Sequence, residues 1–99
     1  MECTFCQIAK GHRVAEIVHK TDRFVVFQPI TKASEKLLIV PALHAESLAD
    51  FPLQELGEWL SIAHHVADIV KARSYRMQIN VNNQFQNVRH IYMQFSYQK

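Results

Sequence analysis

One long segment of the chain carries apolar residues at helical spacing, and the segments on both sides of it are short. Asp50 is a predicted N-cap for this helix, and Pro52 is tolerated in a first turn. Apolar residues then recur at three- and four-residue steps, at Leu53, Leu56, Leu60, Ala63, Ala67 and Val70. Lys71 and Arg73 follow, at the end where the helix dipole favours cations. The sequence therefore predicts one long helix in the middle of the chain.

The segments around this helix predict strands. Residues 4–10 have the spacing of a short helix that ends at Gly11. Strands are predicted at residues 16–19 and 24–27, joined by a turn at 20–23, and at the apolar run 37–40. After the long helix, Met77, Ile79 and Val81 alternate with polar residues, and residues 88–95 form a last strand. We expect an α+β fold with a mostly antiparallel sheet of about five strands.

Size and composition restrict the classes of protein that this chain can belong to. Its 99 residues are 48% apolar, which suits a single domain spanning residues 1–99 with one core. The formal net charge of +2 is too weak to predict a nucleic-acid partner. The longest apolar run, residues 37–43, is too short to cross a membrane, and the N-terminus lacks the features of a signal peptide. A cytoplasmic protein is expected.

Cys3 and Cys6 are the residues most typical of a metal site. In a reducing compartment, a C-x-x-C pair usually supplies two metal ligands or a redox couple. Redox chemistry of the thioredoxin type requires a strand before the motif, and only two residues precede Cys3. A tetrahedral zinc site needs two more ligands, for which the six histidines are candidates. His64 and His65 are adjacent on the predicted helix and point about 100° apart, so they cannot easily share one ion. Composition alone does not choose among the other histidines.

Four segments resemble the histidine-triad (HIT) family, in the right order and over nearly the whole chain. Residues 3–11 (CTFCQIAKG) resemble its start, C-x-F-C-K-I-x-x-G, and residues 24–27 (FVVF) resemble the strand before its ribose loop. Residues 37–44 (LLIVPALH) resemble L-x-I-P-x-x-H, and residues 86–94 (QNVRHIYMQ) align with Q-x-V-x-H-x-H-x-H. The resemblance implies a HIT-like fold with one long and one short helix.

The resemblance also implies a structural zinc ion. In the zinc-bearing, bacterial-type branch of the family, the ligands are the two N-terminal cysteines, the histidine after the I-P segment and the first triad histidine. The matching positions are Cys3, Cys6, His44 and His90, and all four are present.

The catalytic nucleophile of the family, by contrast, is missing. The middle triad histidine of the family attacks the α-phosphate of a nucleotide, and Tyr92 stands at that position. A phenol with an ordinary pKa of about 10 is almost wholly protonated at neutral pH. The third triad position is Gln94, which is not fatal by itself, because the related galactose-1-phosphate uridylyltransferases resemble H-x-H-x-Q. No catalytic residue is therefore assigned.

Other positions of the family's substrate site have also changed. Pro29 stands where the family usually has an acid for the ribose, and Phe85 stands at a glycine of the phosphate loop. Asn80 and Gln86 match nucleotide contacts of the family, and both also suit ordinary polar positions in a strand and a loop. The chain stops at Lys99, without the usual C-terminal tail of the family.

Three functions stay open at this point. The first is a zinc-binding HIT-like domain without nucleotide hydrolase activity, acting as a binding or interaction module. The second is a residual hydrolase or transferase of phosphoramidates or dinucleotides, which needs a group that lowers the pKa of Tyr92. The third is a purine nucleotide binder that does not cleave its ligand. The resemblance also implies a homodimer, because HIT-like domains commonly pair through the helix and a sheet edge. Trp59 and Ile62 add an apolar flank beyond the predicted core stripe, which is either an interface or part of a wide core stripe.

Overall fold

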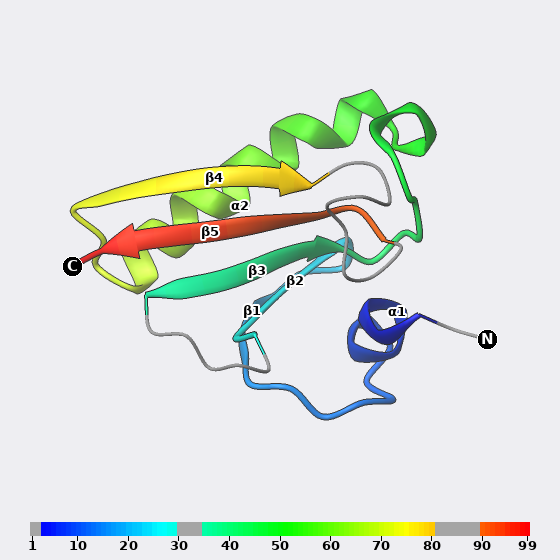
Figure 1. Cartoon of the computed structure of the whole chain (residues 1–99), viewed down its shortest axis with the longest axis horizontal. Helices are drawn as coiled ribbons and strands as arrows, with labels where there is room; N and C mark the ends of the chain where they lie inside the picture. Colours follow the sequence, from blue (N-terminus) through cyan, green and yellow to red (C-terminus); the bar gives the residue numbers. More distant parts are fainter. Residues whose placement is uncertain (1–2, 30–34, 81–89) are drawn as a thin grey trace.

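The computed structural model describes residues 3–29, 35–80 and 90–99. The elements are α1 (Thr4–Ala9), β1 (Ile17–Lys20), β2 (Phe24–Phe27), β3 (Lys36–Pro41), the 3-10 turns η1 (Leu48–Asp50) and η2 (Leu53–Glu55), α2 (Leu56–Ile69), β4 (Ser74–Asn80) and β5 (Tyr92–Gln98). All five strands lie in one antiparallel sheet in the order β1-β2-β3-β5-β4 (Figure 1). The predicted α+β fold is therefore confirmed. In the described ranges, no helix is both long and apolar enough to cross a bilayer.

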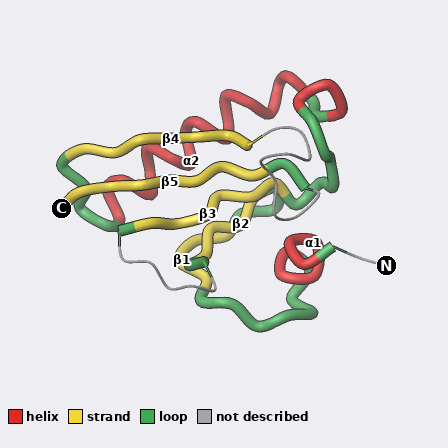
Figure 2. The backbone as a smooth tube through the Cα atoms, in the orientation of Figure 1, coloured by secondary structure: helices red, strands yellow, loops and turns green. Residues whose placement is uncertain are grey.

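The sheet has a different helix on each face, because side chains alternate along every strand. One face packs against α2, and its core includes Phe24, Ile39 and Phe95. The other face packs against α1, and its smaller cluster includes Phe27 and Tyr92. Figure 2 shows that α2 runs along β4 and β5, whereas α1 lies beside the ends of the central strands. Among the described residues, no helix covers the part of the second face that lies away from α1.

The long helix begins later than predicted. Asp50 ends the turn η1 and is not an N-cap, and α2 begins at Leu56 after the second turn η2. The reason is steric, because the proline ring clashes with the residue before it when that residue is helical. Phe51, which precedes Pro52, is accordingly extended, with φ −104° and ψ 134°. A helix starting at Asp50 would require Phe51 to be helical.

The buried face of α2 also differs from the predicted stripe. Its buried residues are Trp59, Ile62, Ala63, Val66 and Ala67. Leu60 is 52% exposed, whereas Trp59 is completely buried. The predicted apolar stripe and the observed buried face share Ala63 and Ala67. Residue spacing alone therefore could not determine which side of α2 faces the sheet. Trp59 and Ile62 are both buried, so of the two alternatives for them the wide core stripe is correct and the interface is not supported. The homodimer stays a prediction.

The last two strands are shifted along the chain. Strand β4 begins at Ser74, three residues before the first alternating residue, and β5 runs from Tyr92 to Gln98. His90 therefore lies in a bend before β5 and does not open the strand. The proposed strand positions 81, 82, 88 and 89 fall outside the described residues. The predicted alternation holds: Ile91, Met93 and Phe95 face α2, and Tyr92 faces α1.

Candidate metal centre

The four predicted metal ligands come together at one end of the sheet. Cys3 caps the N-terminus of α1 and Cys6 lies in its first turn. His44 follows β3 and His90 precedes β5, two antiparallel neighbours, so the two histidines meet at the same end. Figure 1 shows α1 beside this end of β3 and β5. Their ligand atoms all lie within 4.8 Å of one another, although up to 87 residues separate them in the sequence.

The distances between these atoms fit a tetrahedral metal ion. Cys3 Sγ lies 3.5 Å from His44 Nδ1 and 3.2 Å from His90 Nδ1. Cys6 Sγ lies 3.2 Å from His44 Nδ1 and 3.5 Å from His90 Nδ1, and the two sulfurs are 3.1 Å apart. Zinc–sulfur and zinc–nitrogen bond lengths place tetrahedral ligand atoms about 3.3–3.8 Å apart. Two of the sulfur–nitrogen distances, at 3.5 Å, lie in this range. The other two, at 3.2 Å, and the sulfur–sulfur distance of 3.1 Å are shorter, so the four ligands would have to move slightly apart to admit the ion. Two thiols and two imidazoles are also the donors that zinc prefers.

His90 is held in the tautomer that a ligand needs. Its side chain is completely buried, and Nε2 lies 2.8 Å from the Pro41 carbonyl oxygen, to which an Nε2–H donates. The proton on Nε2 leaves the Nδ1 lone pair directed at the two sulfurs. Burial lowers the pKa of His90, and the hydrogen bond to Pro41 opposes this shift. The imidazole therefore favours the neutral form that binds a metal.

The cysteines sit in environments of different exposure. Cys3 is half-buried, and its Sγ accepts a hydrogen bond from the Cys6 backbone N–H at 3.2 Å. Cys6 is buried, and burial raises the pKa of its thiol to about 11, with a further contribution from its hydrogen bond to Cys3. In the metal-free chain this thiol is protonated at neutral pH. Metal binding would therefore release a proton from Cys6.

Tyr92 lies next to this cluster, under α1. Tyr92 is 3% exposed, and its ring packs edge-on against Phe5, with ring centroids 5.2 Å apart. Phe5 also contacts the imidazole of His90 at 5.8 Å. The side chain at the position of the family's nucleophile is thus covered by the helix that carries the two cysteines. Gln94, at the third position, is half-buried on the same face of β5.

The nucleotide-binding candidates are only partly described. Asn80 ends β4 and is paired in register with Tyr92. Gln86 and Phe85 lie outside the described residues. Pro29, at the expected ribose position, lines a cavity of about 400 Å³ with Ile8 and Phe27.

Residues 2–98 match the family model described as scavenger mRNA decapping enzyme C-term binding. The chain belongs to this HIT-like family. Solved HIT structures have the same fold. A histidine triad protein from Clostridium difficile is 27% identical, with a TM-score of 0.87 over 100% of this chain and 95% of that one. A HIT family hydrolase from Legionella pneumophila is 28% identical, with a TM-score of 0.86 over 99% and 94% of the two chains.

A zinc-bound HIT family protein from Mycobacterium smegmatis also shares the fold. It is 23% identical, with a TM-score of 0.87, and the match covers 100% of this chain and 76% of that one. No curated protein matches the chain.

Two features of this HIT-like site were not found from the sequence. The carbonyl that orients His90 belongs to Pro41, and no sequence pattern marks a backbone acceptor. The cover over Tyr92 is Phe5, the aromatic residue of the C-x-F-C segment, which could have been suspected from its place between the cysteines.

Proposed function

We propose that this HIT-like domain binds a structural zinc ion through Cys3, Cys6, His44 and His90, and acts as a binding module without nucleotide hydrolase activity. The ion would link α1 to the ends of β3 and β5. Short distances between two sulfurs and two imidazole nitrogens support zinc, as does the zinc-bound relative from Mycobacterium smegmatis. The metal has a structural role in this proposal, because all four of its coordination positions are taken by side chains.

The observation that carries the loss of activity is Tyr92. An imidazole is nucleophilic at neutral pH and leaves readily from phosphorus, whereas a protonated phenol does neither. In addition, Tyr92 is 3% exposed and lies against Phe5. A nucleophile must reach phosphorus, so a buried side chain is poorly placed for the family's reaction.

We expect no release of nucleoside monophosphate from adenosine phosphoramidate or diadenosine substrates, measured by chromatography at enzyme concentrations near those of the substrate. Tyr92→Phe should behave like the unaltered chain, because it removes only the hydroxyl group. Turnover that disappears in Tyr92→Phe would show instead that the phenol is a nucleophile. A nucleotide adduct on the peptide that carries Tyr92 would lead to the same conclusion.

A second candidate is a purine nucleotide binder that does not cleave its ligand. The cavity lined by Ile8, Phe27 and Pro29 favours it, because its volume of about 400 Å³ and largely apolar wall suit a flat aromatic base. Binding of nucleotides is common in the HIT family, which also favours this candidate. Pro29 counts against tight binding, because it cannot accept hydrogen bonds from ribose hydroxyls as a carboxylate side chain does.

Calorimetry with adenosine and guanosine monophosphates checks this candidate. We expect weak binding at most, in the millimolar range, because the ribose anchor is absent. Phe27 is 2% exposed and belongs to the core, so the variant of choice is Val14→Asp, at a residue of the cavity rim that is 99% exposed. If the unaltered chain shows a heat of binding that Val14→Asp does not show, the ligand binds in this cavity. If the unaltered chain shows no heat of binding, the candidate is excluded.

A further inference from the structure

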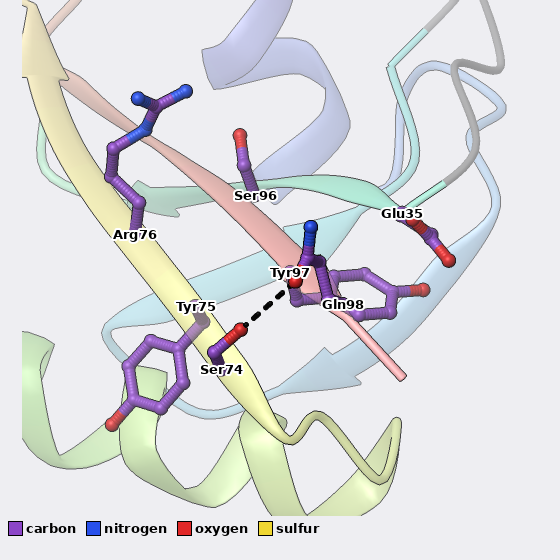
Figure 3. Close-up of a pocket in the computed structure, with 7 residues that line it drawn as sticks. All are labelled: Glu35, Ser74, Tyr75, Arg76, Ser96, Tyr97 and Gln98. Carbon is purple, nitrogen blue, oxygen red and sulfur yellow. Dashed lines mark hydrogen bonds between the residues drawn. The ribbon is translucent and has the colours of Figure 1, made fainter.

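The face of the sheet that α1 leaves uncovered carries a polar surface on β3, β5 and β4. Strand register places side chains of paired residues on the same face. Lys36 of β3 is paired with Ser96 of β5, and Ser96 is paired with Arg76 of β4. These three residues therefore form one row across three neighbouring strands, which we call the cationic row. Figure 3 shows Arg76 and Ser96 pointing to the same side of the sheet.

The rows on both sides of the cationic row are polar but uncharged on β5 and β4. Gln94 is paired with Gln78 on one side, and Gln98 with Ser74 on the other. Ser74 Oγ lies 3.4 Å from Gln98 Oε1, to which it donates a hydrogen bond (Figure 3). This surface therefore offers hydrogen-bond donors around two cations, with no aromatic ring among these paired residues.

The two cations have no acidic partner in the part of the chain that the structure describes. Arg76 and Lys36 make no ion pair or side-chain hydrogen bond with any residue of that part. Directly paired side chains have β-carbons about 5 Å apart, so the β-carbons of Lys36 and Arg76 lie roughly 10 Å from each other, on either side of Ser96. Both side chains are long enough to reach a point above the Ser96 hydroxyl.

A cavity of about 500 Å³ lies at this place, lined by residues that include Arg76, Ser96 and Gln98. Its one acidic side chain, Glu35, lies at the far end from Arg76 (Figure 3). Arg76 is therefore the cation that lines the cavity, together with Ser96, whereas Lys36 belongs to the cationic row but is not a lining residue and follows Glu35 in the sequence. Ser96, the central residue of the cationic row, lies two residues after Gln94, the third triad position. No residue of the row is one of the four candidate metal ligands.

We propose that the cationic row binds the phosphate group of a small phosphomonoester. Phosphate presents oxygens in several directions, which suits a guanidinium fork, an ammonium group and a hydroxyl that converge from three strands. The remainder of the ligand would occupy the cavity toward Glu35. This site does not depend on the proposed zinc ion or on Tyr92.

Titration of the full chain with inorganic phosphate and with glycerol 3-phosphate tests the proposal. The readout is the amide shifts of residues 74–78 and 94–98 in ¹H–¹⁵N spectra, at constant ionic strength set with sodium chloride. Saturable shifts at these residues are expected with both probes. Tighter binding of glycerol 3-phosphate would identify an organic phosphate as the ligand, and equal binding would identify the free anion.

Matched variants locate the site. Arg76→Gln should weaken binding by about tenfold or more, since it removes a charge-assisted hydrogen bond. Lys36→Gln should act in the same direction, and Glu35→Gln should strengthen binding by removing the negative charge of the cavity. Lys20→Gln makes the same change in net charge at an exposed residue of β1, on the opposite edge of the sheet, and should have no effect. No saturable shift, or equal losses in Lys20→Gln and Lys36→Gln, would overturn the proposal.

Discussion

Protein purified without a histidine tag is expected to contain about one zinc ion per chain, and removal of the metal should lower its melting temperature by on the order of 20 °C. A ligand present at a thousand times its dissociation constant stabilises the folded state by about 4 kcal/mol. In a domain of this size, each kcal/mol changes the melting temperature by about 4–8 °C. The loss should be large here because Cys3 and Cys6 connect α1 to strands far away in the sequence. Elemental analysis and thermal unfolding with and without a chelator measure both effects.

A pair of histidine variants separates ligand loss from general destabilisation. His44 and His64 are both exposed, so His44→Ala and His64→Ala remove similar side chains with little change in packing. Only His44→Ala should lose zinc and melt earlier, and Cys3→Ser should behave in the same way. If the unaltered chain holds no zinc, the assignment of these four residues as ligands is wrong. If His64→Ala loses as much zinc as His44→Ala, the ion is bound elsewhere.

Truncation of Trp59 is expected to lower the free energy of unfolding by about 3–5 kcal/mol. Its ring is completely buried and packs against Phe24 and Phe51, with centroids 5.9 and 5.3 Å away. Its Nε1–H also donates a hydrogen bond to the Ile39 carbonyl at 3.2 Å, so α2 is attached to β3 by a polar contact as well as an apolar one. Trp59→Ala would leave a cavity in the core and remove the hydrogen bond to the Ile39 carbonyl. Urea denaturation of the metal-loaded chain measures the change.

Leu60→Ala is the matched control for this prediction. Leu60 is the next residue along α2 and is 52% exposed, so its truncation should cost about 1 kcal/mol or less. Trp59→Phe should fall between the two, because it keeps an aromatic ring and removes the N–H donor. A loss in Leu60→Ala as large as that in Trp59→Ala would mean that the helix faces the sheet with the stripe predicted from spacing.

The four candidate metal ligands were predicted more from the resemblance to the HIT family than from local chemistry. The Cys3–Cys6 pair is a local pattern, and its meaning does not need the fold. The choice of His44 and His90 from six histidines came from the segments that resemble the HIT family. Their meeting depends on antiparallel pairing of β3 with β5, which brings the end of one strand to the start of the other. The partner of His90, the Pro41 carbonyl, follows from the same pairing.

The surface on the uncovered face was not predicted at all. Lys36, Arg76 and Ser96 are far apart in the sequence and belong to no motif. Only the register of β3, β5 and β4 aligns them in one row. A shift of one residue in either pairing would turn one of these side chains to the opposite face.

The sequence by itself determined the order and type of the main helices and strands. It also determined the pair of candidate metal ligands near the N-terminus. Alternation in residues 91–95 placed apolar side chains on one face of a strand, and the C-x-x-C spacing placed two sulfurs on one turn. The tertiary structure decided which face of α2 is buried, because Ala63 and Ala67 suit either rotation and only the pocket for Trp59 distinguishes them. It also decided that Tyr92 lies covered against Phe5. Periodicity is a property of a single segment, whereas burial and proximity require a partner segment, and the partner is set by how the strands pair.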